Sequence, residues 1–186
     1  MIDTKTKVWI EQTPNPNAEK FILPTDVISG GRKKTFDALP LAEGVPLAQA
    51  MFGVSGVVQV HFFQNVISVT QNGTRDWDDL ELDVKQVLQT SFDAHDPNII
   101  DLTPPKVYAS GEIEAIDKVL DRTIRPGLQG DGGDLEILDY DKERKCLLVR
   151  YQGACGSCPS SSAGTLMAIQ QILKDEYDPE IMVING

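Results

Sequence analysis

The chain has 186 residues, of which 41% are hydrophobic and 24% charged, and its 28 acidic and 17 basic side chains give a formal net charge of −11. This composition is typical of a globular protein with enough apolar material for one medium domain or two small ones. An acidic surface repels phosphate backbones, so we expect no nucleic-acid partner, and no apolar run is long enough to span a membrane.

The first residues, MIDTKTKVWIEQ, contain neither the apolar core of a signal peptide nor an Arg-rich transit segment. We therefore expect a cytoplasmic protein, or one of the mitochondrial matrix whose presequence has been removed. The first half of the chain then mixes the two-residue period of strands with the 3.6-residue period of helices. The predicted elements are strands over 7–12 and 20–23 around a Pro/Asn turn at 13–17, a helix over 44–54, a hairpin of 57–63 and 65–71, and a helix over 76–92.

Residues 93–110 contain Pro97, Pro104 and Pro105 and show no sustained periodicity, which predicts an interdomain linker. Beyond it the order is helix, strand, strand, helix, strand. The first of these helices is expected to end at Arg125–Pro126–Gly127. The hairpin strands are predicted over 135–140 and 145–151, a helix with Ala163, Leu166, Ile169 and Leu173 on one face follows, and the last strand is predicted over 180–184.

Between the hairpin and the last helix lies GACGSCPSSSAG, in which Cys155 and Cys158 are two residues apart. Three cysteines are too few for the disulfide framework of a secreted protein, and in a reducing compartment a close pair is more often catalytic or metal-binding than structural. Pro159 suits a first helical position, so backbone N–H groups of the helix start are expected to point at whatever the sulfurs hold. Gly153 and Gly156 leave room for a bulky group.

An inert buried pair and a thioredoxin-like dithiol are alternatives to a metal site, although that dithiol normally follows a central strand early in its domain. A zinc or iron–sulfur site usually has four protein ligands, and this loop offers two. His61 and His95 lie in the other half and are expected to be ordinary polar residues, and Cys146 is expected to be a half-buried strand residue. The missing ligands are then most simply supplied by a second copy across a two-fold axis, and two exposed thiolates per chain make a weak cage that can release its contents.

At this point the sequence resembles a known family. TIRPGLQGDGGDLEIL, a hairpin and then GACGSCPSSSAGTL are similar to the C-terminal domain of NifU, which is found in the Nfu-type iron–sulfur scaffold proteins. EQTPNPNAEKFI, PLAQAMFGVSGVVQVHFF and NVISVTQ with the Trp77 helix resemble the N-terminal domain that many Nfu proteins carry. The matches cover nearly the whole chain in the family's order. The C-terminal match is specific, because it combines the Arg-Pro break, the Asp-Gly-Gly-Asp turn and the Cys-x-x-Cys motif.

The resemblance implies a carrier rather than an enzyme, which assembles a [4Fe–4S] cluster bridged between two subunits and transfers it to apo-proteins. By motif position Cys155 and Cys158 are the cofactor and metal ligands, and Cys146 is outside the motif. The implied partners are a second copy in a cluster-bound homodimer, apo iron–sulfur client proteins and an upstream cluster donor. The Asp-rich scaffold domain and ferredoxin-like cysteines of full NifU are missing, so its other cluster sites are not expected.

We therefore expect an α+β protein of two small domains. Residues 1–92 form an Nfu N-terminal-like domain, 93–109 a Pro-rich linker, and 110–186 a NifU C-terminal-like domain with a three-stranded sheet. Two other function classes stay open: a thiol–disulfide oxidoreductase with Cys155 as nucleophile and Cys158 as resolving thiol, and a plain interaction module that binds through its acidic first half.

Two Gly- and Pro-rich stretches are predicted to be turns. GLQGDGGDLEI lacks the Lys–Ser/Thr of a phosphate loop and leads into a strand, so we expect a turn with positive φ at Gly132 or Gly133. TPNPN is a candidate recognition loop for clients, but turn chemistry alone accounts for its Pro and Asn residues.

Overall fold

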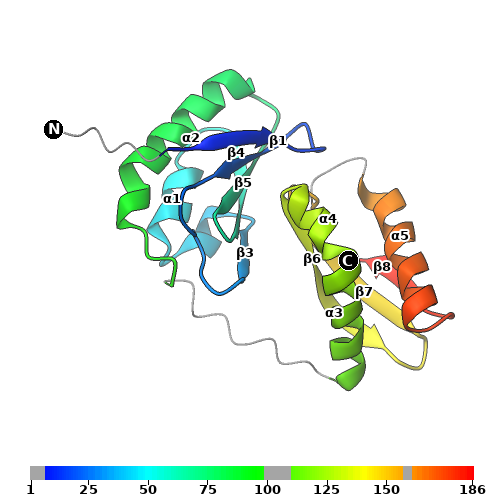
Figure 1. The fold of residues 1–186 in the computed structure, drawn as a ribbon. Coiled ribbons are helices and arrows are strands. Elements are labelled where there is room, and N and C mark those ends of the chain that lie inside the picture. Colours follow the sequence, from blue (N-terminus) through cyan, green and yellow to red (C-terminus); the bar gives the residue numbers. More distant parts are fainter. Residues whose placement is uncertain (1–6, 99–109, 157–160) are drawn as a thin grey trace.

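A computed structural model describes residues 7–98, 110–156 and 161–186. The chain folds into two α+β domains, each with its own sheet and its own hydrophobic core (Figure 1). We call residues 7–98 the N-terminal domain and the described residues from 110 onward the C-terminal domain. The predicted fold class, with two small α+β domains, is confirmed. Within the described residues, no helix combines the length and apolarity needed to cross a membrane.

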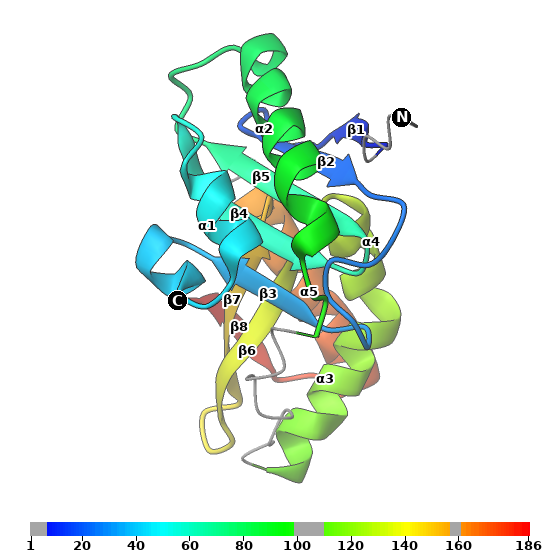
Figure 2. The ribbon, with the colours of Figure 1, turned by 90° about the vertical axis from the view of Figure 1, so that its left-hand side faces the viewer.

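The N-terminal domain is a five-stranded antiparallel sheet with helices on one face (Figure 2). The strand order is β1-β2-β5-β4-β3. The elements are β1 (Trp9–Gln12), β2 (Ala18–Ile22), β3 (Lys33–Phe36), η1 (Leu39–Ala42), α1 (Pro46–Phe52), β4 (Val57–Phe63), β5 (Val66–Gln71), α2 (Trp77–Ser91) and η2 (Phe92–Ala94). The predicted hairpin and both helices are present, and their ends shift by at most two residues.

Alternation along the strands gives this sheet one apolar and one polar face. Phe21, Phe62 and Ile67 are fully buried in the core, where Leu80 and Val84 of α2 also lie. The intervening residues form a row across four strands, because Lys20 pairs with Ser68, Ser68 with His61, and His61 with Thr35. We call Lys20, Ser68, His61 and Thr35 the polar row. It lies on the sheet face that is turned away from the helices.

The C-terminal domain packs helices against a three-stranded sheet of order β6-β7-β8. Its elements are α3 (Gly111–Thr123), α4 (Arg125–Gly130), β6 (Gly133–Asp141), β7 (Cys146–Gly153), α5 (Ser161–Glu176) and β8 (Met182–Asn185). Strands β6 and β7 form the predicted antiparallel hairpin, and β8 pairs parallel to β7 after the α5 crossover. The core contains Ile116 and Leu120 of α3, Leu147 and Val149 of β7, and Ile169 of α5.

Three features differ from the sequence prediction. Strand β3 and the short 3-10 helix η1 that follows it were not predicted. Arg125–Pro126–Gly127 does not simply end a helix, because α3 ends at Thr123 and a second short helix, α4, begins with Pro126 in its first turn. Proline fits there because the first helical N–H groups have no intrahelical partner.

The third difference concerns the start of the predicted linker. The His95 ring nitrogen Nε2 lies 2.6 Å from the Val27 carbonyl oxygen, and the His95 ring stacks on Phe92. The Ser29 N–H donates to the Pro97 carbonyl at 3.1 Å. Residues 93–98 therefore pack on the N-terminal domain. The remainder of the predicted linker, 99–109, lies outside the described residues.

Candidate metal centre

The cysteine loop begins where β7 ends. Gly153 has φ +60, a left-handed conformation that favours glycine, and turns the chain out of the strand. The Ala154 N–H then donates to the Gly132 carbonyl at 3.1 Å, and the Gly156 N–H donates to the Gly153 carbonyl at 3.0 Å. These bonds fix the backbone on both sides of Cys155. Cys158 and Pro159 lie outside the described residues, so the predicted ligand pair and helix start stay predictions.

Cys155 is only 6% exposed, which corrects the expectation of an exposed thiolate at this position. Its sulfur lies against the turn that precedes β6. A Cβ added at Gly133 would come 2.5 Å from Cys155 Sγ, so only glycine leaves room for the sulfur there. The predicted positive φ is at Gly132, at +80. The Asp-Gly-Gly-Asp turn is thus a seat for Cys155 rather than a ligand site of its own.

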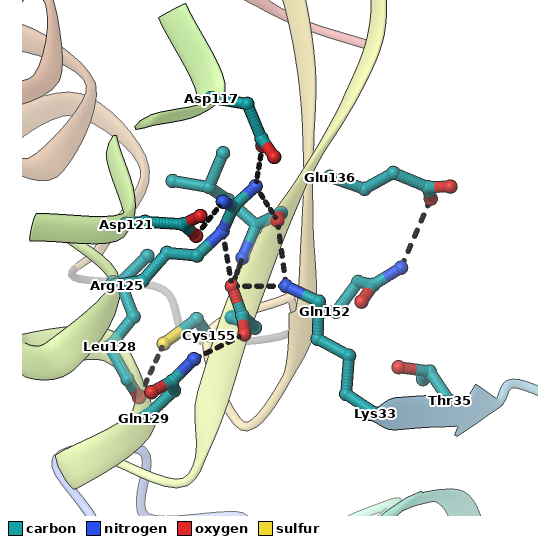
Figure 3. Close-up of polar contacts among 12 residues, drawn as sticks. Lys33, Thr35, Asp117, Asp121, Arg125, Leu128, Gln129, Glu136, Gln152 and Cys155 are labelled. Carbon is teal, nitrogen blue, oxygen red and sulfur yellow. Dashed lines mark hydrogen bonds and ion pairs between the residues drawn. The ribbon is translucent and has the colours of Figure 1, made fainter. Parts of the chain in front are cut away.

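An ionic cluster beneath this turn holds it in place (Figure 3). The Arg125 guanidinium, 3% exposed, contacts Asp117 Oδ1 at 2.5 Å through Nη2 and Asp134 Oδ1 at 3.2 Å through Nε, and it also pairs with Asp121. Asp134 is fully buried and accepts a hydrogen bond from Gln129 Nε2 at 2.9 Å. We call Arg125, Asp117, Asp121 and Asp134 the arginine cluster. Burial by itself lowers the pKa of Arg125, but the bonds with Asp117 and Asp121 outweigh it and raise that pKa.

Tyr151 completes the apolar surroundings of Cys155. Both residues belong to the hydrophobic core of the C-terminal domain. Burial first, and then the nearby Cys155, raise the pKa of Tyr151 to about 12. The phenol therefore stays neutral over the physiological range, and the wall beside the sulfur carries no charge.

Residues of the N-terminal domain also reach this site. Asn15, in the TPNPN turn, donates through Nδ2 to the Ala154 carbonyl at 2.8 Å. Lys20 donates to the Gly130 carbonyl at 2.7 Å, and Lys33 contacts Asp134 Oδ1 at 2.6 Å. The sequence pointed to none of these three, because each contact joins residues more than a hundred positions apart and leaves no local pattern.

The other candidate ligands do not converge on Cys155. Cys146 begins β7, so it lies seven residue steps from Gly153 at the other end of the strand, about 23 Å at 3.3 Å per residue. His61 Nδ1 lies 2.8 Å from Thr35 Oγ1, and His95 contacts the Val27 carbonyl. In the part of the chain that the structure describes, no three His, Cys, Asp or Glu side chains are grouped so that they could hold a metal ion.

Comparison with known proteins agrees with both domains. Residues 8–95 match the family described as scaffold protein Nfu/NifU N terminal, and residues 116–184 match the NifU-like domain. The chain is 33% identical over 182 residues to NifU-like protein 5, mitochondrial, of Arabidopsis thaliana, which covers 89% of this chain and 66% of that protein. It is 31% identical over 179 residues to the NFU1 iron-sulfur cluster scaffold homolog, mitochondrial, of Drosophila ananassae, with 94% and 62% covered.

The chain spans somewhat less than two thirds of the length of these two relatives. Among solved structures, a NifU-like protein from Saccharomyces cerevisiae superposes with a TM-score of 0.44 at 18% identity, covering 48% of this chain and 80% of that chain. The two matched domains, in this order and with Cys155 at the end of β7, define a two-domain protein of the NifU class. The chain belongs to the family of Nfu-type iron–sulfur scaffold proteins.

Proposed function

We propose that this protein is an iron–sulfur cluster scaffold and carrier. Cys155 and Cys158 of two copies together hold one [4Fe–4S] cluster, which is then transferred to apo-proteins. Membership of the Nfu-type family supports the scaffold role, and the relative from Drosophila is named for it. The observation that carries the proposal is the glycine-lined seat of Cys155, in which Gly133 and Gly153 fix one soft sulfur ligand at the edge of the domain.

The residues around Cys155 suit a thiolate that holds iron. Cluster iron is bound by cysteine thiolates, and solvent exposure and hydrogen bonds to the sulfurs help to set the reduction potential of the cluster. Gly133 brings backbone rather than a side chain against the sulfur. Tyr151 adds an uncharged wall, and the arginine cluster fixes the turn below. These residues hold the Cys155 sulfur in place without enclosing the cluster that it is proposed to bind.

The need for a second copy follows from the ligand count. A four-iron cluster has four irons to ligate, and the loop motif supplies two cysteines. Cys146 is about 23 Å from the loop along β7, and His61 and His95 are engaged elsewhere. Two copies of the loop related by a two-fold axis supply four thiolates. The partners are then a second copy, an upstream cluster donor and apo client proteins, and the mitochondrial names of the relatives favour the matrix of the two expected locations.

The test is anaerobic reconstitution of the full chain with iron and sulfide, followed by quantitation of both and by light scattering. Cys155→Ser and Cys158→Ser are each expected to lose at least tenfold in retained iron, because a hydroxyl is a poor ligand for soft-metal sites. Cys146→Ser is the matched control and should retain iron like the unsubstituted chain. The loaded protein should be a dimer with one cluster per two chains.

Three outcomes would count against this function. Equal loss of iron from Cys146→Ser would exclude the two-ligand loop. A loaded monomer with a full cluster per chain would exclude the bridged site. Disulfide reduction by a colourless protein, with loss of activity in Cys155→Ser, would favour the oxidoreductase alternative.

A further inference from the structure

The two domains touch through a small polar contact centred on the cysteine loop. We define the docking contact as Asn15, Lys20, Lys33 and the polar row on one side, and Gly130 to Leu135 with Gly153 and Ala154 on the other. Asn15 is 1% exposed, so its 2.8 Å bond to the Ala154 carbonyl is shielded from water. Ala154 immediately precedes Cys155. The N-terminal domain is therefore bonded to the backbone of the cysteine loop itself.

Backbone glycines of the C-terminal domain let the polar row come this close. A Cβ added at Gly132 would lie 2.9 Å from both Lys20 Cγ and Ser68 Oγ. One added at Gly153 would lie 3.0 Å from His61 Cγ. The Gly132 carbonyl also accepts from the Ala154 N–H, and Gly153 begins the cysteine loop, so the N-terminal domain docks on the same surface that positions Cys155.

One side of Cys155 faces the TPNPN turn. A cavity of about 40 Å³ beside the sulfur is lined by residues of both domains: Pro14, Asn15, Leu128, Asp131, Ala154, Cys155 and Thr165. A cavity needs about 10–15 Å³ to hold one water, so this one admits a few waters at most. It admits neither an iron–sulfur cluster nor the cysteine loop of a second chain.

The docking contact also has features that favour separation of the two domains. Under it, among the described residues, His61 Nε2 and Ser68 Oγ are buried without a hydrogen-bond partner, and such atoms regain water when the domains part. Beside the contact the domains diverge around a cleft of about 1080 Å³, which reaches the cysteine loop at Gly156 and is lined farther out by Lys34 and Leu41 on one side and Leu138 and Arg150 on the other. The docked arrangement is therefore held by a few polar bonds, and it leaves His61 Nε2 and Ser68 Oγ buried without partners, which is unfavourable.

We propose that the N-terminal domain is a releasable cover of the cluster site: it docks on the cysteine loop of the metal-free chain, shields Cys155, and separates when a second copy shares a cluster. This inference deepens the proposed function, because it assigns the N-terminal domain the control of access to that site. It predicts two states of the full chain, a closed monomer without metal and an open dimer with the cluster.

The test measures alkylation of Cys155 by iodoacetamide in the metal-free full chain, with tandem mass spectrometry to assign each cysteine and Cys146 as the internal reference. Asn15→Asp keeps the oxygen that accepts from the Asn17 N–H and replaces the donor to Ala154 with a second oxygen that repels that carbonyl. Lys33→Gln removes the cation beside Asp134. The double variant should be alkylated at Cys155 about tenfold faster, with Cys146 unchanged.

The matched control is Asn72→Asp with Lys85→Gln, which makes the same chemical and charge changes in the N-terminal domain but away from the docking contact. Asn72 accepts from Thr74, and Lys85 pairs with Glu81 on the same helix. Control and unsubstituted chains should be alkylated at equal rates. If Asn15→Asp unfolds the N-terminal domain, as shown by tryptophan fluorescence, Lys33→Gln alone carries the test.

An unchanged Cys155 rate in a folded docking variant would overturn the proposal, because the thiol would then be shielded by its own domain. Since no iron is present, this result does not depend on the proposed function. Conversely, faster alkylation of the docking variant in a protein that never takes up iron would support the role of the N-terminal domain as a cover and would contradict the scaffold function. X-ray scattering of the reconstituted chain should show two extended copies, and two compact copies per cluster would also contradict release.

Discussion

The two domains differ in how they are held together, and the difference explains where the candidate site lies. The N-terminal domain buries a largely apolar sheet face under α1 and α2, and its polar row is on the opposite face. The C-terminal domain instead places the arginine cluster beside its core, directly under the cysteine loop. Apolar burial stabilises without demanding precise geometry, whereas a buried ion cluster is stable only when every partner is in position. The candidate site therefore lies in the domain whose stability depends on exact ion-pair geometry.

The largest expected effect comes from removing the arginine at the centre of the arginine cluster. Arg125→Met removes the buried guanidinium that pairs with Asp117 and contacts Asp134, and removing one partner of a buried ion pair typically costs about 3–5 kcal/mol. Arg122→Met is the matched control, because Arg122 is largely exposed and pairs with Glu176 at the surface, which predicts a loss below about 1 kcal/mol. Hydrogen exchange across α3, α4 and β6 measures the loss in the free energy of unfolding.

The same variant tests whether the domains are independent. Trp9 and Trp77, the two tryptophans of the chain, both lie in the N-terminal domain. Their fluorescence should report an unchanged urea midpoint in Arg125→Met. A midpoint that falls with the C-terminal domain would mean that the two domains unfold as one unit.

The next effect is a loss of stability in acid that depends on His61. Burial first lowers the pKa of His61 from 6.5 to about 4, while Asp134 and Asp37 oppose the shift and Lys33 adds to it. Between these values the unfolded chain binds a proton that the folded chain does not. The folded state should therefore lose about 3 kcal/mol as pH falls from 6.5 to 4, and no more below it. Urea unfolding of the unsubstituted chain minus that of His61→Gln gives this difference, and a flat difference curve would contradict it.

Glu19 should act in the opposite direction. Its carboxyl is buried between β2 and α2, and burial first, then Glu81, raise its pKa from 4.5 to about 7, with Asp78 adding to the shift and Lys85 opposing it. The folded state then holds a proton that the unfolded chain releases, so stability falls as pH rises from 4.5 to 7. Glu19→Gln should stabilise the protein by about 2 kcal/mol at pH 8 and by nothing near pH 4.5. Equal stability of the two proteins at pH 8 would show that the carboxyl is already accommodated.

The smallest expected effect comes from a pair of glycine variants, which distinguish backbone strain from disruption of the docking contact. Gly132 and Gly73 have nearly the same φ, +80 and +79, so alanine at either position costs about 1–2 kcal/mol of strain. A Cβ at Gly132 meets Lys20 and Ser68 at 2.9 Å, whereas at Gly73 the nearest atom, Asn17 Oδ1, is 3.6 Å away. Both variants should lose similar stability, but only Gly132→Ala should expose Cys155 to alkylation. Equal exposure in Gly73→Ala would attribute the effect to strain.

The sequence was informative where neighbours in the chain determine the structure. The β4–β5 and β6–β7 hairpins, the helices α1, α2, α3 and α5, and the positive φ near Cys155 followed from periodicity and turn chemistry. Strand β3 was missed because KKTF is a short edge strand without alternating apolar residues. Helix α4 was missed because a proline that ends one helix can equally begin the next.

The residues of the site that the sequence did not predict are those whose contact partners lie far away along the chain. Arg125 was interpreted as part of a helix stop, although it is the centre of a buried cluster. Asn15 in TPNPN was assigned to turn chemistry, and it does hold that turn through Asn17, but its amide also bonds to Ala154. A single sequence carries no signal for contacts of this range, because neither partner alters the local pattern of the other.

The parallel pairing of β8 with β7 has a consequence for biosynthesis. The cysteine loop lies between β7 and α5, and the sheet that anchors it is completed only when β8 pairs with Cys146–Val149. Domains generally fold in order as the chain emerges from the ribosome. The N-terminal domain is therefore complete, with Asn15 and the polar row in place, before the cysteine loop acquires its shape. A newly made loop meets its cover as it forms, so its thiols need not pass through a period of full exposure to stray metal or oxidant.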